Sequence, residues 1–197
     1  MTFIKGALCE LRVLERSDEE ACVWTKAVNA GLTTRHLFTG SYPMRPIDVK
    51  EVWEREAKAG SVEFGVWLPN SPDGIHINAV IIDQETGKMT ECPDRFIGTC
   101  GLYSHRDVYR SWEFRILIFS PDHIGKGIGT EATRLTVDYA FRRLNAHRVW
   151  LGVHSDNIGA IKCYEKVGFK REGVLRDEVF TYGKYWDAVR MGILETD

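Results

Sequence analysis

The stretch from Asp122 to Thr130 has a residue pattern suited to binding a phosphate. It alternates Gly125, Gly127 and Gly129 with other residues, between an apolar run and an amphipathic one. A glycine turn that opens a helix places unpaired backbone N–H groups at the positive end of that helix, where anions bind well. The stretch therefore indicates a pyrophosphate site, although an ordinary loop before a helix can have the same composition.

Spacing excludes two common nucleotide loops. In the nucleoside-triphosphate loop a Ser or Thr follows the lysine, whereas Gly127 follows Lys126. The dinucleotide fingerprint needs Gly-x-Gly-x-x-Gly, whereas these glycines alternate singly and lie in the second half of the chain.

The elements that position this loop can be predicted from periodicity. Residues 96–103 and 112–119 read as an antiparallel strand pair, and Trp112 and Phe114 lie on the face opposite Glu113. Residues 130–144 form the clearest helix, with a charge stripe that we expect to be solvated: Glu131, Arg134, Asp138 and Arg142.

The last third of the chain continues with alternating elements. We expect a buried strand over 148–153, a helix from Asn157 to Val167 that ends at Gly168, and two strands over 174–182 and 186–194.

The first ninety-odd residues are less regular. We expect a strand over 7–14 and then a helix to about Ala30 that Ser17 or Asp18 caps, with Glu20 in a capping box. Asp48 is expected to cap a second helix through Ala59, with Gly60 as its stop. Between these helices, Gly40, Pro43 and Pro46 punctuate a predicted loop that contains Tyr42. Short strands are expected over 64–68 and 75–83, with turns over 69–74 and 84–88, whereas the insertion around residues 84–95 is not placed.

This order of elements predicts an α/β fold of the α+β type, with a mixed, mostly antiparallel sheet and helices on both faces. A chain of 197 residues suits a single domain, 1–197.

Composition excludes several classes of function. The net charge of −2 disfavours nucleic acid and anionic membranes as partners, and no apolar run approaches the length of a membrane span. Five scattered cysteines, no recognisable signal segment and six histidines without ligand spacing favour a reduced, cytoplasmic protein without a metal.

Four pieces of the chain together carry a resemblance to a known family. They are Trp112-Glu113-Phe114 with Ile116 to Phe119, the loop Gly125 to Ala132, Asn157, and Tyr164 to Phe169. With them the sequence resembles the GNAT superfamily of acetyl-CoA-dependent N-acetyltransferases, most closely the branch of ribosomal-protein N-terminal and spermidine acetyltransferases. The resemblance is strongest over 95–197 and implies the GNAT fold, with a split between two central strands. One position departs from the family pattern, because Ile124 stands where the loop usually begins with Arg or Gln.

The resemblance implies how acetyl-CoA would be held. The loop from Ile124 to Thr130 would bind its pyrophosphate through backbone N–H groups, with Lys126 either adding a charge or remaining solvated. Asn157 would hydrogen-bond to the pantetheine arm and also cap a helix. The cofactor-binding residues are thus Leu117, Ile118, Phe119, Ile124, Gly125, Lys126, Gly127, Ile128, Gly129, Thr130 and Asn157.

The resemblance also implies catalytic roles. Tyr164 would protonate the departing thiolate, unless it is simply a core aromatic. Glu113 could accept a proton from an alkylammonium group, only bind that cation, or pair with Arg115. Cys163 suggests an acetyl-cysteine intermediate, but no histidine is placed to activate it, so a structural thiol and direct transfer in a ternary complex are favoured.

The expected activity is therefore N-acetylation of a primary amine, whose acceptor is a polyamine, a protein N-terminus or an aminoglycoside. Asp177, Glu178 and the acidic residues of the second helix could attract a cationic acceptor. A coenzyme-binding sensor without turnover is the alternative, and a homodimer is left open.

Overall fold

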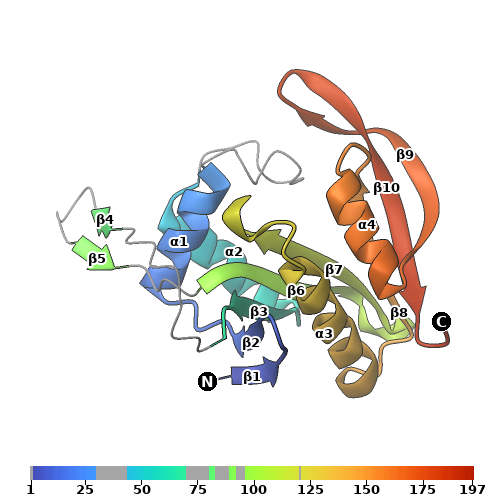
Figure 1. The fold of residues 1–197 in the computed structure, drawn as a ribbon, viewed down its shortest axis with the longest axis horizontal. Coiled ribbons are helices and arrows are strands. Elements are labelled where there is room, and N and C mark those ends of the chain that lie inside the picture. Colours follow the sequence, from blue (N-terminus) through green and yellow to red (C-terminus); the bar gives the residue numbers. More distant parts are fainter. Residues whose placement is uncertain (1, 30–43, 70–79, 83–88, 92–95, 120) are drawn as a thin grey trace.

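The computed structural model describes residues 2–29, 44–69, 80–82, 89–91, 96–119 and 121–197. Its centre is an eight-stranded sheet in the order β1-β2-β3-β6-β7-β8-β10-β9 (Figure 1). Strands β4 (Val80–Ile82) and β5 (Met89–Glu91) pair separately. The central strands are β1 (Thr2–Lys5), β2 (Glu10–Val13), β3 (Val62–Trp67), β6 (Phe96–Arg106), β7 (Ser111–Ile118), β8 (Arg148–His154), β9 (Lys170–Thr181) and β10 (Lys184–Leu194).

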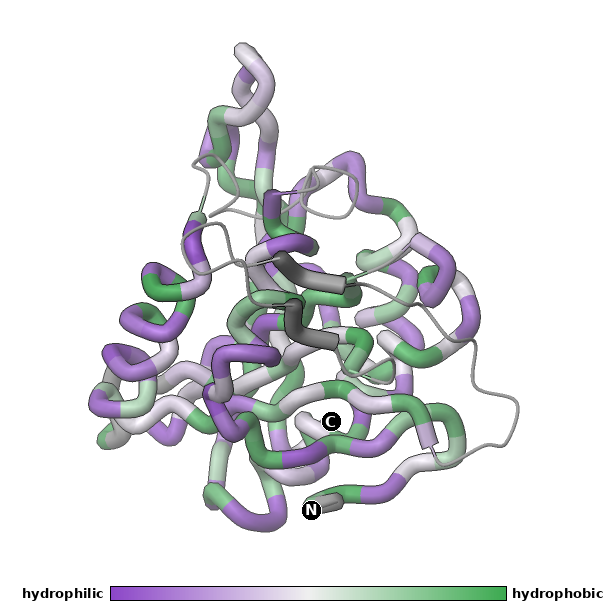
Figure 2. The backbone as a smooth tube through the Cα atoms, turned by 90° about the vertical axis from the view of Figure 1, so that its left-hand side faces the viewer, coloured by the Kyte–Doolittle hydropathy of each residue, from purple (hydrophilic) through white to green (hydrophobic). Residues whose placement is uncertain are grey.

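Helices cover both faces of this sheet, as predicted. They are α1 (Asp18–Asn29), α2 (Pro46–Lys58), α3 (Ile128–Arg143) and α4 (Ile158–Val167). Adjacent residues of β6 show the two layers, because Thr99 accepts a hydrogen bond from Trp24 of α1 (3.2 Å) whereas Cys100 contacts Thr136 of α3 (3.3 Å). Neighbouring side chains of a strand point to opposite faces. Hydrophobic and hydrophilic segments alternate along the helices in Figure 2, as expected for helices with one face on a core.

Side-chain hydrogen bonds to the backbone hold the first turns of both N-terminal helices. The predicted Ser17–Glu20 box is confirmed, since the Ser17 N–H donates to Glu20 (3.3 Å) and the Glu20 N–H to the Ser17 hydroxyl (3.2 Å). Helix α2 begins at Pro46, so the prediction that Asp48 is its cap was wrong. Asp48 instead lies in the first turn and accepts the Arg45 N–H (2.7 Å), and the predicted stop at Gly60 has φ +85°.

The prediction of a strand over 7–14 was wrong for the first half of that range. Residues 2–5 and 10–13 form an antiparallel hairpin, and residues 6–9 are its turn. The Ala7, Leu8 and Cys9 N–H groups donate to the Glu131 carboxylate, so they do not pair with a strand. Glu131 therefore does not belong to a solvated charge stripe as predicted, whereas the exposed Asp138–Arg142 ion pair fits that prediction.

The remaining elements differ from the predictions mainly in their bounds. Helix α3 starts two residues earlier than expected, and β9 starts at Lys170 rather than at residue 174. Helix α4 ends at Gly168 with φ +114°, as predicted. The predictions for Gly40, Tyr42 and Pro43, for the turns over 70–74 and 84–88, and for most of the insertion lie outside the described residues.

Candidate active site

Strands β7 and β8 separate near the middle of the sheet. They pair in parallel only from Ser111↔Arg148 to Glu113↔Trp150, although β7 continues to Ile118 and β8 to His154. We call the region beyond the Glu113↔Trp150 pair the fork. It corresponds to the split between central strands that the sequence resemblance predicts.

The edge of β7 that faces the fork can be assigned from its pairing with β6. The Phe119 N–H donates to the Ile97 carbonyl on β6 (2.9 Å), and Leu117 pairs with Thr99 of the same strand. Backbone groups of successive strand residues point to opposite edges. The N–H and C=O of Ile118 therefore point toward the fork, whereas those of Leu117 and Phe119 point toward β6.

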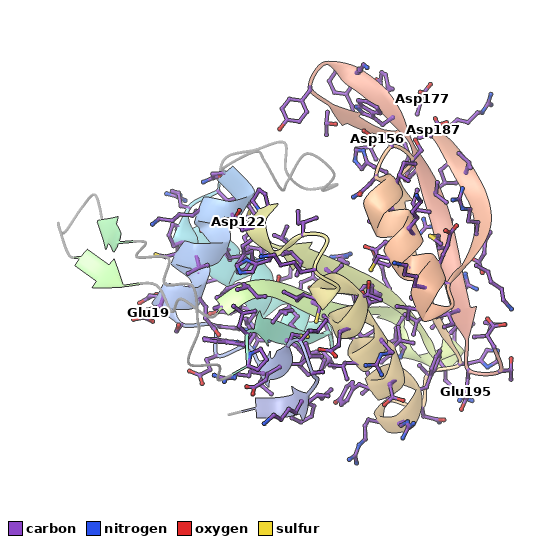
Figure 3. The ribbon with its side chains drawn as sticks, viewed as in Figure 1. Glu19, Asp122, Asp156, Asp177, Asp187 and Glu195 are labelled. Carbon is purple, nitrogen blue, oxygen red and sulfur yellow. The ribbon has the colours of Figure 1, made fainter. Side chains whose placement is uncertain are left out.

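The glycine loop follows β7 and leads into α3. Asp122, labelled in Figure 3, lies in a short 3₁₀ turn before it, and Gly125 and Gly127 have φ of +79° and +83°. The N-cap residue of α3 is Gly127, which has no side chain to accept the first N–H groups of the helix, and the first helical residue is Ile128. Since the first N–H groups of a helix have no partner within it, this end of α3 offers backbone donors to an anion.

The side chains of the loop are mostly exposed. Ile124 is 59% exposed and Lys126 is also on the surface, whereas Ile128 is buried. Buried His123 lies just before the loop, and burial together with the nearby Lys126 charge lowers its pKa, so it is neutral at pH 7.

Contacts connect the loop to the fork through α4. The Thr130 hydroxyl donates to the Cys163 sulfur (3.2 Å), which joins the first turn of α3 to α4. The next residue, Tyr164, packs edge-on against Phe114, the first β7 residue beyond the last β7–β8 pair (ring centroids 6.3 Å apart). The candidate residues on the loop, on α4 and on β7 thus lie in one region.

Asn157 and Tyr164 make the contacts expected of a helix cap and of a core aromatic residue. Asn157 caps α4 by accepting the Ala160 N–H (3.1 Å). Tyr164 is 9% exposed and also packs against Phe169 (5.9 Å), so it is a core aromatic at the same time as it borders the fork. Burial, followed by the neighbouring Cys163, raises the pKa of Tyr164 well above its ordinary value.

Glu113 is held by an arginine. Arg115 donates to both Glu113 carboxylate oxygens (3.0 and 2.9 Å), and its guanidinium stacks over the Tyr103 ring (4.2 Å). The pairing left open in the sequence analysis is therefore present. It gives Glu113 a fixed orientation and compensates part of its charge.

A cavity of about 330 Å³ lies beside the fork, next to Glu113. Both charged and apolar side chains line it, and the Arg190 guanidinium stacks over the Trp150 ring (4.2 Å). Sequence reasoning considered Glu113 and Glu178 but missed the other members. The main lining residues are Glu113, Trp150, Leu175, Glu178, Phe180 and Arg190.

The β9–β10 hairpin, which supplies much of this lining, extends away from the rest of the sheet (Figure 1). Asp177 and Asp187 lie close together on it (Figure 3), and Asp187 accepts the Asp177 N–H (3.0 Å). Glu178, the acidic residue that follows Asp177, lines the cavity and has no ion pair within the described part of the chain.

The described residues contain no group of three or more His, Cys, Asp or Glu side chains that could hold a metal ion. Within the same part of the chain, no helix is long and apolar enough to cross a membrane.

A family model described as "Acetyltransferase (GNAT) domain" matches residues 9–170. The chain belongs to the GNAT acetyltransferase family. The GNAT fold predicted from the sequence is thereby confirmed, with its eight-stranded mixed sheet and the fork between β7 and β8.

Several relatives of this GNAT protein are polyamine acetyltransferases. A spermidine N(1)-acetyltransferase of Escherichia coli K12 is 40% identical over 107 residues, which are 54% of this chain and 57% of the relative. The corresponding enzyme of Vibrio cholerae is 40% identical over 108 residues, 55% of this chain and 62% of the relative. The match thus spans about three fifths of the length of these curated relatives.

A solved structure extends the likeness over nearly the whole chain. Spermidine N-acetyltransferase from Vibrio cholerae, in complex with CoA and spermine, superposes with a TM-score of 0.74 at 26% identity. The superposition covers 97% of this chain and 98% of that one.

Proposed function

We propose that this GNAT protein transfers the acetyl group of acetyl-CoA to a primary amine of a polyamine, by direct attack in a ternary complex. The observation that carries the proposal is the fork between β7 and β8, which opens beside an uncapped helix N-terminus. One long ligand with a pyrophosphate and an amide-bearing arm fits both features. Its reactive end would lie near the cavity that Glu113 lines.

The coenzyme is held mainly by backbone groups. The N–H groups of Ile128, Gly129 and Thr130 bind the pyrophosphate, and Gly125 and Gly127 allow its close approach. The pantetheine arm pairs with β7 as an extra strand would. A backbone N–H of β7 would polarise the thioester carbonyl of acetyl-CoA by donating a hydrogen bond to it. Since the Phe119 N–H already donates to the Ile97 carbonyl, we assign this role to the Ile118 N–H.

Tyr164 supplies the hydrogen bond to the departing sulfur. Its raised pKa keeps the hydroxyl protonated at neutral pH, which a donor requires. It also makes the phenol a weaker acid than a thiol, whose pKa is about 8.5. The main contribution of Tyr164 is therefore a hydrogen bond that stabilises the developing thiolate, while the phenol keeps its proton.

The cavity suits a cationic acceptor with an aliphatic chain. Glu178 offers a carboxylate for an ammonium group, and Phe180 offers aromatic surface for cation–π and methylene contacts. The Trp150 ring, by contrast, is already covered by Arg190. Glu113 is the candidate base or cation ligand, although Arg115 competes with the acceptor for both of its oxygens. The polyamine relatives support the same class of acceptor.

Cys163 has a structural role in this proposal. Its sulfur accepts the Thr130 hydrogen bond that joins α3 to α4, which supports direct transfer over an acetyl-cysteine intermediate. A burst of CoA release in the absence of an amine would contradict direct transfer.

The decisive experiment incubates the protein with acetyl-CoA and a panel of amines, and follows free thiol. Spermidine and spermine are expected to be acetylated faster than an N-terminal peptide or an aminoglycoside. A preference for either of the latter would reassign the acceptor. Tight binding of CoA without turnover on any amine would support the sensor alternative. The homodimer and the cytoplasmic location remain predictions, and sedimentation of the purified chain tests the first.

A further inference from the structure

Glu131 is a charged residue in the first turn of α3 that is only 8% exposed. Its carboxylate accepts three backbone hydrogen bonds from the turn between β1 and β2. One oxygen accepts the Ala7 N–H (3.0 Å), and the other accepts those of Leu8 (2.6 Å) and Cys9 (2.8 Å). The turn is closed by the Gly6 N–H, which donates to the Cys9 carbonyl (2.9 Å), so it wraps around this carboxylate.

The turn and the carboxylate are fitted to each other. Burial alone would raise the pKa of Glu131, but the N–H donors of Leu8, Ala7 and Cys9 outweigh it and lower that pKa, so the group is ionised at neutral pH. A Cβ on Gly6 would lie 2.5 Å from the Glu131 carboxylate oxygen. Gly6 is therefore the residue that lets the turn close over the carboxylate.

Glu131 also belongs to the first turn of α3, which follows the glycine loop. The Glu131 N–H donates to the Gly127 carbonyl (3.0 Å), which forms the first turn of α3. A Cβ on Gly127 would lie 3.2 Å from a Leu8 methyl group, so the hairpin turn packs directly against the loop. Glu131 thus connects the N-terminal hairpin to the backbone of Gly127 and α3.

The direction of the Glu131 side chain also affects the helix N-terminus. A glutamate in a first turn can fold back onto the N–H groups of its own helix, where it would compete with a bound anion. Here the carboxylate is bound by three N–H groups of another element. The N–H groups of Ile128, Gly129 and Thr130 are left for the ligand.

We propose that Glu131 is a positioning residue for the coenzyme pyrophosphate. By holding the β1–β2 turn against the start of α3, it fixes the orientation of the phosphate-binding N–H groups without touching the coenzyme. This inference rests on the proposed function, in which residues 125–130 bind acetyl-CoA. It adds the N-terminal hairpin, which sequence reasoning assigned no role, to the coenzyme site.

The test compares acetyl-CoA with acetyl-pantetheine, which lacks the pyrophosphate. In Glu131→Gln one acceptor oxygen becomes an NH₂ group that cannot accept the hairpin N–H groups. We expect kcat/KM for acetyl-CoA to fall about tenfold, mainly through KM, because a displaced positioning group typically costs this much. The kcat/KM for acetyl-pantetheine should stay within twofold of the parent protein, on the order of experimental error.

Two further variants guard against a folding defect. Gly6→Ala places a methyl group against the Glu131 carboxylate and the Cys9 carbonyl and should produce the same selective loss. The double variant should lose little more, because both changes act on one contact. Glu195→Gln removes an exposed partner of Arg110 and serves as the matched control with unchanged kinetics.

The outcomes separate this inference from the proposed function. Equal losses with acetyl-CoA and acetyl-pantetheine, or parent-like acetyl-CoA kinetics in folded Glu131→Gln and Gly6→Ala, would overturn the role of Glu131. A parent protein that releases thiol from neither donor would instead contradict the proposed function. If Glu131→Gln does not fold, Gly6→Ala alone decides the question by the same comparison.

Discussion

Replacing Gly125 by alanine should weaken acetyl-CoA binding through backbone strain alone. Gly125 has φ +79°, and a Cβ added there would meet no atom within 4 Å. The left-handed conformation costs an L-residue about 1–2 kcal/mol. The free loop of the variant is expected to leave the left-handed conformation, and the coenzyme must then restore this conformation on binding. This cost corresponds to a Kd for acetyl-CoA that is about 5- to 30-fold higher.

The chain offers a matched control for this strain. Gly60 has φ +85° and equally open surroundings, but it follows α2 rather than the glycine loop. Gly60→Ala should therefore lower the free energy of unfolding by a comparable amount, about 1 kcal/mol, and leave the Kd for CoA unchanged.

A third variant separates strain from steric exclusion. Gly129 lies in the first turn of α3 and has ordinary φ, and a Cβ there would meet nothing within 4 Å. Alanine should stabilise the helix by about 0.5–1 kcal/mol and yet weaken CoA binding, because its methyl group occupies space that the phosphate needs. Calorimetry gives the Kd and thermal unfolding gives the stability. Parent-like CoA binding by both Gly125→Ala and Gly129→Ala would refute the assignment of this loop to the pyrophosphate.

Four other predictions follow from the described contacts. Tyr164→Phe should lower kcat about 100-fold or more while the Kd for CoA, measured by calorimetry, stays constant; near-normal turnover would contradict the role in thiolate stabilisation. Glu178→Gln should raise KM for spermidine about fivefold, because one ion pair of about 1 kcal/mol is lost, without changing KM for acetyl-CoA. The lowered pKa of Glu131 stabilises the fold fully above about pH 4.5 and less as pH falls through the folded-state value, so the stability difference between the parent and Glu131→Gln, followed by urea unfolding, should shrink on acidification. Burial raises the pKa of Cys9 and Cys100 to about 12, so neither thiol should react with iodoacetamide in the native protein at about pH 8, as mass spectrometry of the labelled chain can show.

Local sequence signals predicted the parts of the fold that depend on neighbouring residues. The Ser17–Glu20 capping box and the Gly168 helix stop are set by side chains within a few positions, and both occur as predicted. The glycine loop was likewise located before α3 because strand, turn and helix follow each other directly in the chain.

Long-range contacts could not be read from the sequence in the same way. The helical wheel placed Glu131 on a solvated stripe, because a helical wheel contains only the residues of one helix. It could not show that Glu131 binds a hairpin turn more than 120 positions away in the sequence. The alternating pattern of residues 7–14 corresponds to a strand only from Glu10 onward. The N–H groups of the residues before Glu10 donate to the Glu131 carboxylate instead of pairing with a strand.

The cavity beside the fork shows the same limit. Trp150 was assigned to a buried strand, although Val149, Leu151 and Val153 alternate with it and occupy the core face. That alternation was the available signal for a residue on the opposite face. Nothing local indicated that Arg190 would stack on Trp150, because the pairing of β10 with β8 brings them together.

The most direct measurement of the central claim is mass spectrometry of spermidine after incubation with acetyl-CoA and the purified protein. We expect spermidine carrying one acetyl group, formed in step with free CoA, and a strongly reduced yield with Tyr164→Phe. Unmodified spermidine and intact acetyl-CoA in the presence of a protein that binds CoA tightly would contradict it.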